Sequence, residues 1–287
     1  MSGALERSLN ILEYLAEHPA GVALSTLAGD LEIPLSAAHR LLVELIRFGY
    51  ARQDAHDGHY RLTTKLVSIG LSYLSRTGIV DLAQPLLEQL AATSGELVRL
   101  AVVDGEDLIF VAKAQGARHG LRYDPDMGLS VALPCSAAGH AWLATMPEDE
   151  ALAIVARKGL CDPKDYGPNA PTSIAAVMAY VTAARERGYS TINEVFSPGM
   201  TAMAAPVFGS AGHAIGVVTI AGPSVRLSER RMADLGPAIL DIAAQVSHRS
   251  FQVCLLLVLH TAAGRAASTA ATMVANMERN SNVEFLS

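Results

Sequence analysis

The hydrophobic positions of the first segment predict three helices. In the first helix, apolar residues recur at helical spacing and form the stripe expected to face the core, at Leu5, Leu9, Leu12 and Ala16, widened by Ile11 and Leu15. A second short helix begins near Ser25. The third runs from Ser36 to Phe48 and places apolar side chains on one side, at Ala38, Leu41, Leu42, Leu45 and Phe48.

Two short extended runs follow the third helix. Residues 50–53 and 59–62 flank an Asp57-Gly58 pair, which is a turn signal between strands. Three helices followed by a two-stranded ribbon form the outline of a winged helix-turn-helix, whose second turn-flanking helix enters the major groove of DNA. Residues 1–62 are therefore predicted to be a DNA-binding domain.

The rest of the chain alternates helical and extended patterns. A helix over residues 63–78 would join two domains, and Gly95 would end the next helix, over residues 81–94. Two pairs of strands are expected, at 96–103 with 108–114 and at 200–208 with 214–221. Helices are expected at 136–145, 148–157, 172–187 and 228–249. This pattern predicts an α+β domain over residues 79–249, a class that often holds a small-molecule pocket between sheet and helices.

Composition bounds these expectations. A length of 287 residues suggests two domains, and 51% hydrophobic with 17% charged residues is typical of a globular protein. The three cysteines, Cys135, Cys161 and Cys254, show no C-x-x-C spacing, so neither a disulfide framework nor a thiolate zinc site is indicated and a cytoplasmic location is expected. The longest apolar run, residues 251–259, covers about half of the roughly 20 residues that span a bilayer, so no membrane partner is expected.

Net charge confines any nucleic-acid site to a local surface. The whole chain has a formal net charge of −6, and residues 1–62 contain five arginines and eight acidic residues, which leaves −3. From Ser36 to Leu62, however, four arginines face three acidic residues, which leaves +1. The third helix and the wing are therefore the predicted DNA side, and with so few cations we expect useful affinity only from a homodimer or homotetramer.

Several blocks of sequence resemble the IclR family of bacterial transcription regulators. They are ALERSLNILEYL, SAAHRLLVELIRFGYARQ, YRLTTKLVSIG, LPCSAAGHAWLA, NEVFSPGMTAMAAPVF and IGVVTIAGP, in the family's order between Ala4 and Arg249. The resemblance implies an N-terminal winged helix-turn-helix, a linker helix and a C-terminal GAF-like effector-binding domain, with no enzymatic activity. It also implies regulation of a catabolic operon, usually by repression, with activation as the alternative. The tail, residues 250–287, lies outside it.

The third helix and wing supply the candidate DNA contacts. Arg40 is the best candidate base reader, since arginine can grip guanine O6 and N7 together. Ser36 and His39 are expected at bases or phosphates, and Arg47, Arg52 and Arg61 at phosphates. Leu35 departs from the family, whose members commonly have a basic residue just before the serine, so this chain lacks the side chain for that phosphate contact.

The segment 133–139 is the candidate effector site. It opens a helix, where free backbone N–H groups at Ser136, Ala137 and Ala138 suit a carboxylate, although Ser136 could simply cap the helix. Family members that bind small polar acids place polar side chains at positions that match Ile192, Ala202, Thr219 and Ala221 here. Only Thr219 is polar, which favours a more apolar organic acid, including an aromatic one. Glu194 is a further candidate, whereas Met127, Met200 and Met203 are more typical of plain core.

Other functional classes find little support in the sequence. Ser136 and His140 are four residues apart and could mimic a nucleophile and its base in a hydrolase, but no acid orients the histidine and no G-x-S-x-G turn is present. His56 and His59 have no further ligand-type partners, so no metal site is predicted. We expect no cofactor.

Overall fold

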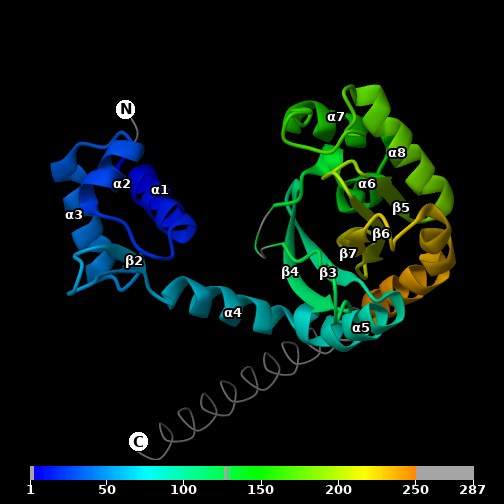
Figure 1. The fold of residues 1–287 in the computed structure, drawn as a ribbon, viewed down its shortest axis with the longest axis horizontal. Coiled ribbons are helices and arrows are strands. Elements are labelled where there is room, and N and C mark those ends of the chain that lie inside the picture. The colour runs from blue at the N-terminus through cyan, green and yellow to red at the C-terminus, as the bar shows by residue number, and fades with distance from the viewer. Residues whose placement is uncertain (1–2, 126–127, 129, 250–287) are drawn as a thin grey trace, which may run out of the picture. The chain divides into compact units, whose positions relative to one another are not determined.

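A computed structural model of the chain describes residues 3–125, 128 and 130–249, and it separates two compact units between Thr77 and Gly78 (Figure 1). The predicted tail, residues 250–287, lies outside the described residues, as do Met127 and Cys254. No helix within the described ranges combines the length and the apolar character needed to cross a bilayer.

The N-terminal unit has the predicted order of elements. Its helices are α1 (Ala4–Glu17), α2 (Leu24–Asp30), α3 (Leu35–Arg47) and α4 (Lys65–Thr77). Between α3 and α4, strand β1 (Ala51–Gln53) pairs antiparallel with β2 (Tyr60–Leu62), so that Arg52 lies opposite Arg61. Side chains from α1, α2, α3 and the hairpin form one core. This is the three-helix and hairpin arrangement of a winged helix-turn-helix.

Four predicted core positions of this unit are wrong, three in α1 and one at the end of α3. In α1 the buried residues are Ile11 and Leu15, whereas Leu5 and Leu9 are 74% and 49% exposed and Ala16 is exposed as well. The two stripes are neighbours on one helix, and α1 turns its Ile11 side toward α3 and β2. Phe48 follows the last turn of α3 as its C-cap and is 55% exposed, because the chain leaves the helix there.

The C-terminal unit is built on a five-stranded antiparallel sheet in the order β4-β3-β7-β6-β5. Its strands are β3 (Leu97–Asp104), β4 (Asp107–Gln115), β5 (Ser190–Asn193), β6 (Met200–Phe208) and β7 (Ala214–Pro223). The sequence pattern predicts four of these and misses β5, which extends the sheet at the free edge of β6. The α+β class is confirmed.

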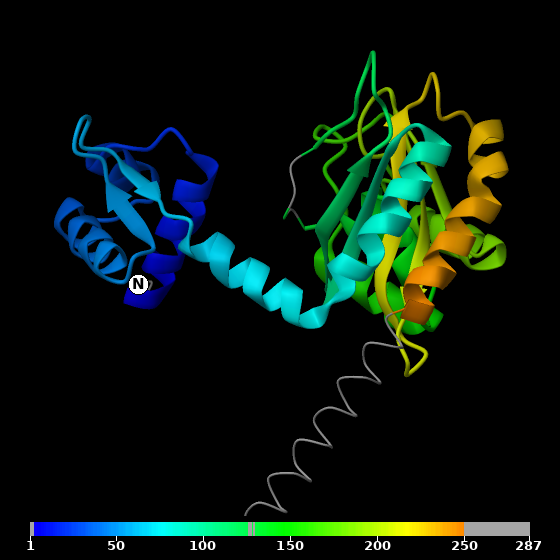
Figure 2. The ribbon, with the colours of Figure 1, turned by 90° about the horizontal axis from the view of Figure 1, so that it is seen from below.

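Helices cover both faces of this sheet. Helix α5 (Ile79–Ser94) and a closing helix over residues 229–249 pack on one face and lie side by side in Figure 2. The other face is covered by η1 (Leu133–Cys135), α6 (Ala137–Leu143), α7 (Glu148–Lys158) and α8 (Ile174–Arg187). Strand alternation separates the two faces, since Val98 and Leu100 belong to the first core and Ala101 belongs to the second.

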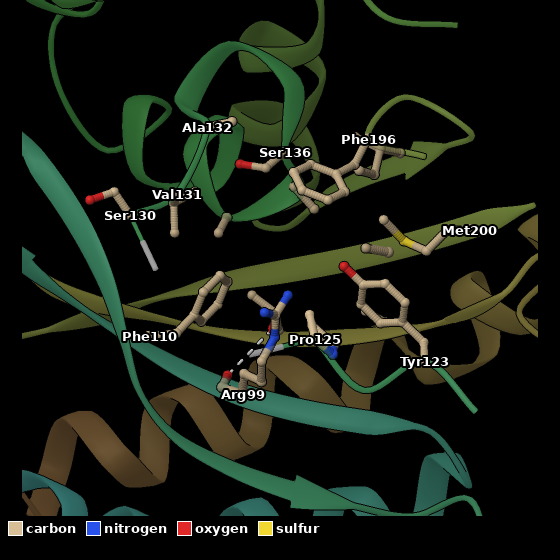
Figure 3. Close-up of a pocket in the computed structure, with 16 residues that line it drawn as sticks. Arg99, Phe110, Tyr123, Pro125, Ser130, Val131, Ala132, Ser136, Phe196 and Met200 are labelled. Carbon is tan, nitrogen blue, oxygen red and sulfur yellow. Dashed lines mark hydrogen bonds between the residues drawn. The ribbon is translucent and has the colours of Figure 1, made fainter. Parts of the chain in front are cut away.

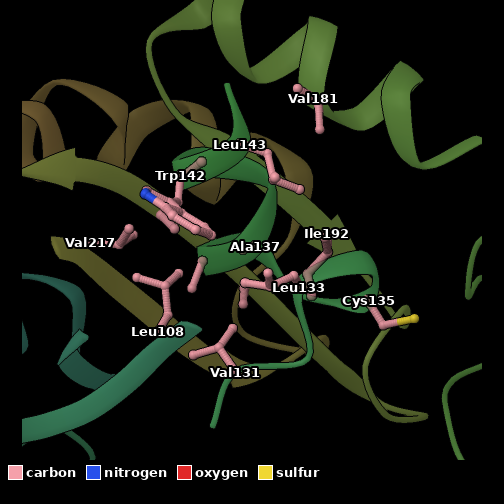
Figure 4. Packing of buried hydrophobic residues seen from close by; sticks show 14 of the residues in the cluster. Leu108, Val131, Leu133, Cys135, Ala137, Trp142, Leu143, Val181, Ile192 and Val217 are labelled. Carbon is pink, nitrogen blue, oxygen red and sulfur yellow. The ribbon is translucent and has the colours of Figure 1, made fainter. Parts of the chain in front are cut away.

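The start of α6 depends on small residues. All seven residues of this helix are buried, and Ala137 and Trp142 pack with Leu133, Ile192 and their neighbours between the sheet and α8 (Figure 4). A Cβ atom added at Gly139 would lie 2.2 Å from the carbonyl oxygen of Leu133. Glycine at this position therefore lets the 3-10 turn fold tightly back against the helix that follows it.

We expect the Gly139→Ala substitution to destabilise the C-terminal unit by at least about 2 kcal/mol, because the added methyl group overlaps backbone that cannot move aside. The matched control is Gly29→Ala, since Gly29 is also helical and nothing lies within 4 Å of its added Cβ. The control should leave stability unchanged or raise it by up to about 1 kcal/mol. Chemical unfolding of the two variants measures both effects, and equal stabilities would contradict the packing described for α6.

Candidate functional site

Three of the predicted DNA contacts share the exposed side of α3. Ser36, His39 and Arg40 are all exposed, whereas Ala38 and Leu42 on the opposite side are fully buried. No ion pair engages Arg40 within the described part of the chain. Its guanidinium is therefore available to an external partner.

The other three arginines predicted to contact DNA differ in the contacts that they already make within the protein. Arg47 donates to Glu44 at 2.6 Å and lies over the ring of Phe48, but most of its side chain is exposed. Arg52 is exposed on β1. Both remain accessible.

Arg61, in contrast, is tied into the wing. Its guanidinium donates to the carboxylates of Asp54 and of Asp57, the latter at 2.7 Å, and to the carbonyl oxygen of Ala20 at 2.9 Å. Only 20% of its side chain is exposed. These contacts hold the turn of the wing to the loop after α1, so that Arg61 is far less available to phosphate than Arg52.

A cavity that is partly open to solvent lies between the sheet and the start of α6 (Figure 3). Seven of the eight predicted effector residues line it: Ser136, Ala137, Ala138, Ile192, Ala202, Thr219 and Ala221. Glu194 is not among the lining residues. It follows the end of β5 at a positive φ of 49°, in the turn that leads to β6. Met200 lines the cavity, and Met203 lies on the opposite face of the sheet in the core against α5.

The first turn of α6 forms one wall of this cavity. The hydroxyl of Ser136 accepts a hydrogen bond from the backbone N–H of Gly139 at 3.1 Å, so this serine does cap the helix. The N–H groups of Ala137 and Ala138 precede the hydrogen-bond ladder of the helix. Their methyl side chains leave this wall open to the cavity.

Arg99 on β3 forms the opposite wall and was not predicted as a site residue. Its guanidinium extends from the sheet toward the middle of the cavity in Figure 3, and the residue is only 9% exposed. None of the described residues accepts a hydrogen bond from its Nε atom. The signal in the sequence is a single arginine within the otherwise apolar run from Leu97 to Val103, a pattern that points to a charge inside the fold.

Aromatic side chains surround this guanidinium. Its Cζ atom lies 3.6 Å from the ring centroid of Phe110 and 5.9 Å from that of Tyr123. Burial lowers the pKa of Arg99 from its ordinary value, and Tyr123 opposes this shift by stabilising the cation. Thr219 on the neighbouring strand donates to the Arg99 carbonyl oxygen at 3.5 Å, drawn as a dashed line in Figure 3.

Ser136 and His140 do not form the pair that a hydrolase would need. The Nε2 atom of His140 is hydrogen-bonded to the carbonyl oxygen of Pro134 at 2.8 Å, and the ring stacks on Tyr180. This histidine is fully buried, and burial lowers its pKa to about 4. Its position in the core, away from the cavity lining, indicates a packing role.

No group of three or more His, Cys, Asp or Glu side chains is arranged to hold a metal ion within residues 3–125, 128 and 130–249. In the wing, the backbone N–H groups of His56 and His59 donate to Asp54 and Asp57, as in ordinary turns.

Two family models match the chain. The model described as "IclR helix-turn-helix domain" matches residues 4–55, and that described as "Bacterial transcriptional regulator IclR C-terminal" matches residues 71–248. The second match alone covers more than half of the chain and includes the whole cavity.

Individual relatives agree with these matches. The chain is 28% identical to the HTH-type transcriptional repressor AllR of Salmonella paratyphi A, over 85% of this chain and 88% of that protein. The crystal structure of Thermotoga maritima IclR is 25% identical, with a TM-score of 0.69 over 86% of this chain and 98% of that one. An IclR homologue from Microbacterium hydrocarbonoxydans, solved with 4-hydroxybenzoate, shares the fold with a TM-score of 0.72 at 20% identity, over 88% of this chain and 100% of that one. The chain belongs to the IclR family of bacterial transcriptional regulators.

Proposed function

We propose that this regulator represses a catabolic operon by binding operator DNA through α3 and the wing, and that a small, largely apolar organic acid in the cavity of the C-terminal unit alters this binding. The observation that carries the proposal is the cavity itself, whose walls combine apolar side chains with the buried cation of Arg99. We place its action in the cytoplasm, where the DNA is.

The DNA-binding part of the proposal rests on the exposed face of α3. Ser36, His39 and Arg40 share that face, and Arg47 and Arg52 remain accessible for phosphates. Arg61 supports the wing in this account, with a phosphate contact as a secondary role. Residues 1–62 would read the operator, and residues 63–78 would link them to the sensor at 79–249.

Assembly is part of the proposal because each chain offers few cations to DNA. Affinity for DNA comes largely from neutralised phosphates, and two copies on two half-sites double their number. We therefore propose a homodimer or homotetramer on the operator, as the charge of the first 62 residues suggests.

Apolar walls favour an apolar effector. Ile192, Ala202 and Ala221 stand where the family's binders of small polar acids have polar side chains, and Phe110 and Phe196 add aromatic surface. Apolar walls with a few polar groups are the usual character of small-molecule sites. The complex of the Microbacterium homologue with 4-hydroxybenzoate shows that one protein of this fold holds an aromatic acid.

We propose that the protein represses transcription because AllR, which aligns along most of the chain, is a repressor. Activation is the alternative within the same family. In either case the acid can shift DNA binding only by the difference in its affinity for the two states of the regulator.

We expect the Arg40→Ala variant to lose roughly 1–3 kcal/mol of operator binding and to relax base preference, because a bidentate arginine–guanine contact is removed. Arg157→Ala is the matched control, since this exposed arginine lies on α7 in the other unit. Gel-shift titration on the DNA upstream of the neighbouring genes measures both. Unchanged affinity and sequence preference for Arg40→Ala would remove it from the interface.

We also expect operator affinity to fall steeply with salt, since phosphate contacts release counterions. Replacing Arg52 by alanine should lower the slope of log affinity against log salt by about one per site. Fluorescence anisotropy at a series of salt concentrations gives this slope. Binding that does not respond to salt would instead indicate a winged helix used for protein contacts.

For the effector, we expect calorimetric titration to rank aromatic acids above short hydroxylated acids, because only Thr219 of the four matching positions offers a polar side chain. Preference for a highly hydroxylated acid would contradict the apolar cavity proposed here.

A further inference from the structure

We propose that Arg99 pairs with the carboxylate of the effector and makes the cavity selective for an anionic ligand over its neutral analogue. This inference rests on the proposed function in one respect, namely that the cavity is the effector site. It assigns the charge recognition to a side chain on the sheet rather than to the backbone at the start of α6.

The first observation is an unpaired charge inside the fold. Arg99 is 9% exposed, and among the described residues its Nε atom has no hydrogen-bond partner and no carboxylate forms an ion pair with it. A buried cation without an anionic partner carries a large desolvation cost, which an anion with matching geometry would offset.

The second observation is that nearby carboxylates are already engaged. Asp124 accepts from Lys113 at 2.7 Å and from Arg122 at 3.4 Å. Glu96, three residues before Arg99 in the chain, accepts from both Nε and an Nη of Arg226. Among the described residues that line the cavity there is no acidic side chain, and Arg99 contributes a positive charge to it.

The third observation is the aromatic contact of the guanidinium. Its Cζ atom lies 3.6 Å from the ring centroid of Phe110, a cation–π contact that uses none of its N–H groups. A carboxylate binds arginine through such N–H groups, in the plane of the guanidinium. The contact with Phe110 therefore stabilises the cation beside the cavity without competing with an acid for hydrogen bonds.

The other residues that line the cavity indicate that the uncharged part of the ligand is apolar. Ile192, Met200, Phe196, Ala202 and Ala221 are apolar and face the same space as Arg99. A compact, single-ring carboxylate satisfies both demands, because its ring meets apolar walls while its charge meets Arg99. Benzoate is the simplest such probe, and benzamide has the same shape without the charge.

The experiment is calorimetric titration of benzoate and benzamide into the full-length protein and three variants. The wild type should bind benzoate roughly 10- to 100-fold more tightly than benzamide, as a charge-assisted pair provides. Arg99→Met should reduce benzoate affinity to that of benzamide while leaving benzamide affinity unchanged. Arg99→Lys should keep part of the preference, and Arg157→Met, on exposed α7, should keep all of it.

Thermal unfolding checks that Arg99→Met is folded, and its melting temperature should equal or exceed that of the wild type because an unpaired buried cation is removed. Equal affinity of the wild type for the two probes, no binding of benzoate at millimolar concentration, or a preference that survives in Arg99→Met would each overturn the inference. Binding to operator DNA is measured separately from effector binding, in gel shifts. An Arg99-dependent preference in a protein that ignores operator DNA would uphold this inference and contradict the proposed function.

Discussion

The buried guanidinium of Arg99 is the constraint around which the cavity of the C-terminal unit is arranged. β3 is an interior strand of the sheet, and its other inward positions are apolar. Among the described residues, the ring of Phe110 and the hydroxyl group of Tyr123 stabilise the buried cation. A cation at this depth without an anionic partner costs stability, and an acid bound as proposed above would offset that cost. Binding of the acid would then change the stability of the fold around the cavity.

The cavity also lies between two structural layers, where a bound ligand would contact both. Its walls come from the sheet and from the tight turn of η1 and α6, where Gly139 leaves no space between helix and turn. Ala137 and Ala138 bring the backbone of α6 close to the space that faces Arg99. A ligand held between Arg99 and α6 would therefore contact both the sheet and the helical layer of the unit. If the two layers move relative to each other when the ligand binds, that movement would transmit its binding.

The sequence predicts much of this architecture because its signals are local. Helical stripes, Gly95 at a helix end and the Asp57-Gly58 turn depend on neighbours along the chain, and the small residues after Leu133 mark the wall at α6. The misses depend on contacts that are distant in sequence. β5 has only four residues and follows α8 at an edge, too short for an alternating pattern. Which stripe of α1 is buried is decided by α3 and β2.

Contacts between residues distant in sequence also explain why some site residues could be predicted and others could not. Family positions lead to Ile192, Ala202, Thr219 and Ala221, and the strand register brings them together. Arg61 carries a charge that suits DNA, but Asp54, Asp57 and the loop after α1 engage it. No rule of spacing distinguishes such an arginine from Arg52 beside it.

The central claim is that acid binding in the cavity and DNA binding by α3 are coupled. The most direct test is the operator affinity of the full-length protein, measured by fluorescence anisotropy with and without a saturating amount of the tightest-binding aromatic acid and, separately, of its amide. The account predicts that the acid changes operator affinity by about 5- to 150-fold and that the amide, at the same concentration, leaves it nearly unchanged. Operator affinity that stays constant while the acid occupies the cavity would contradict it.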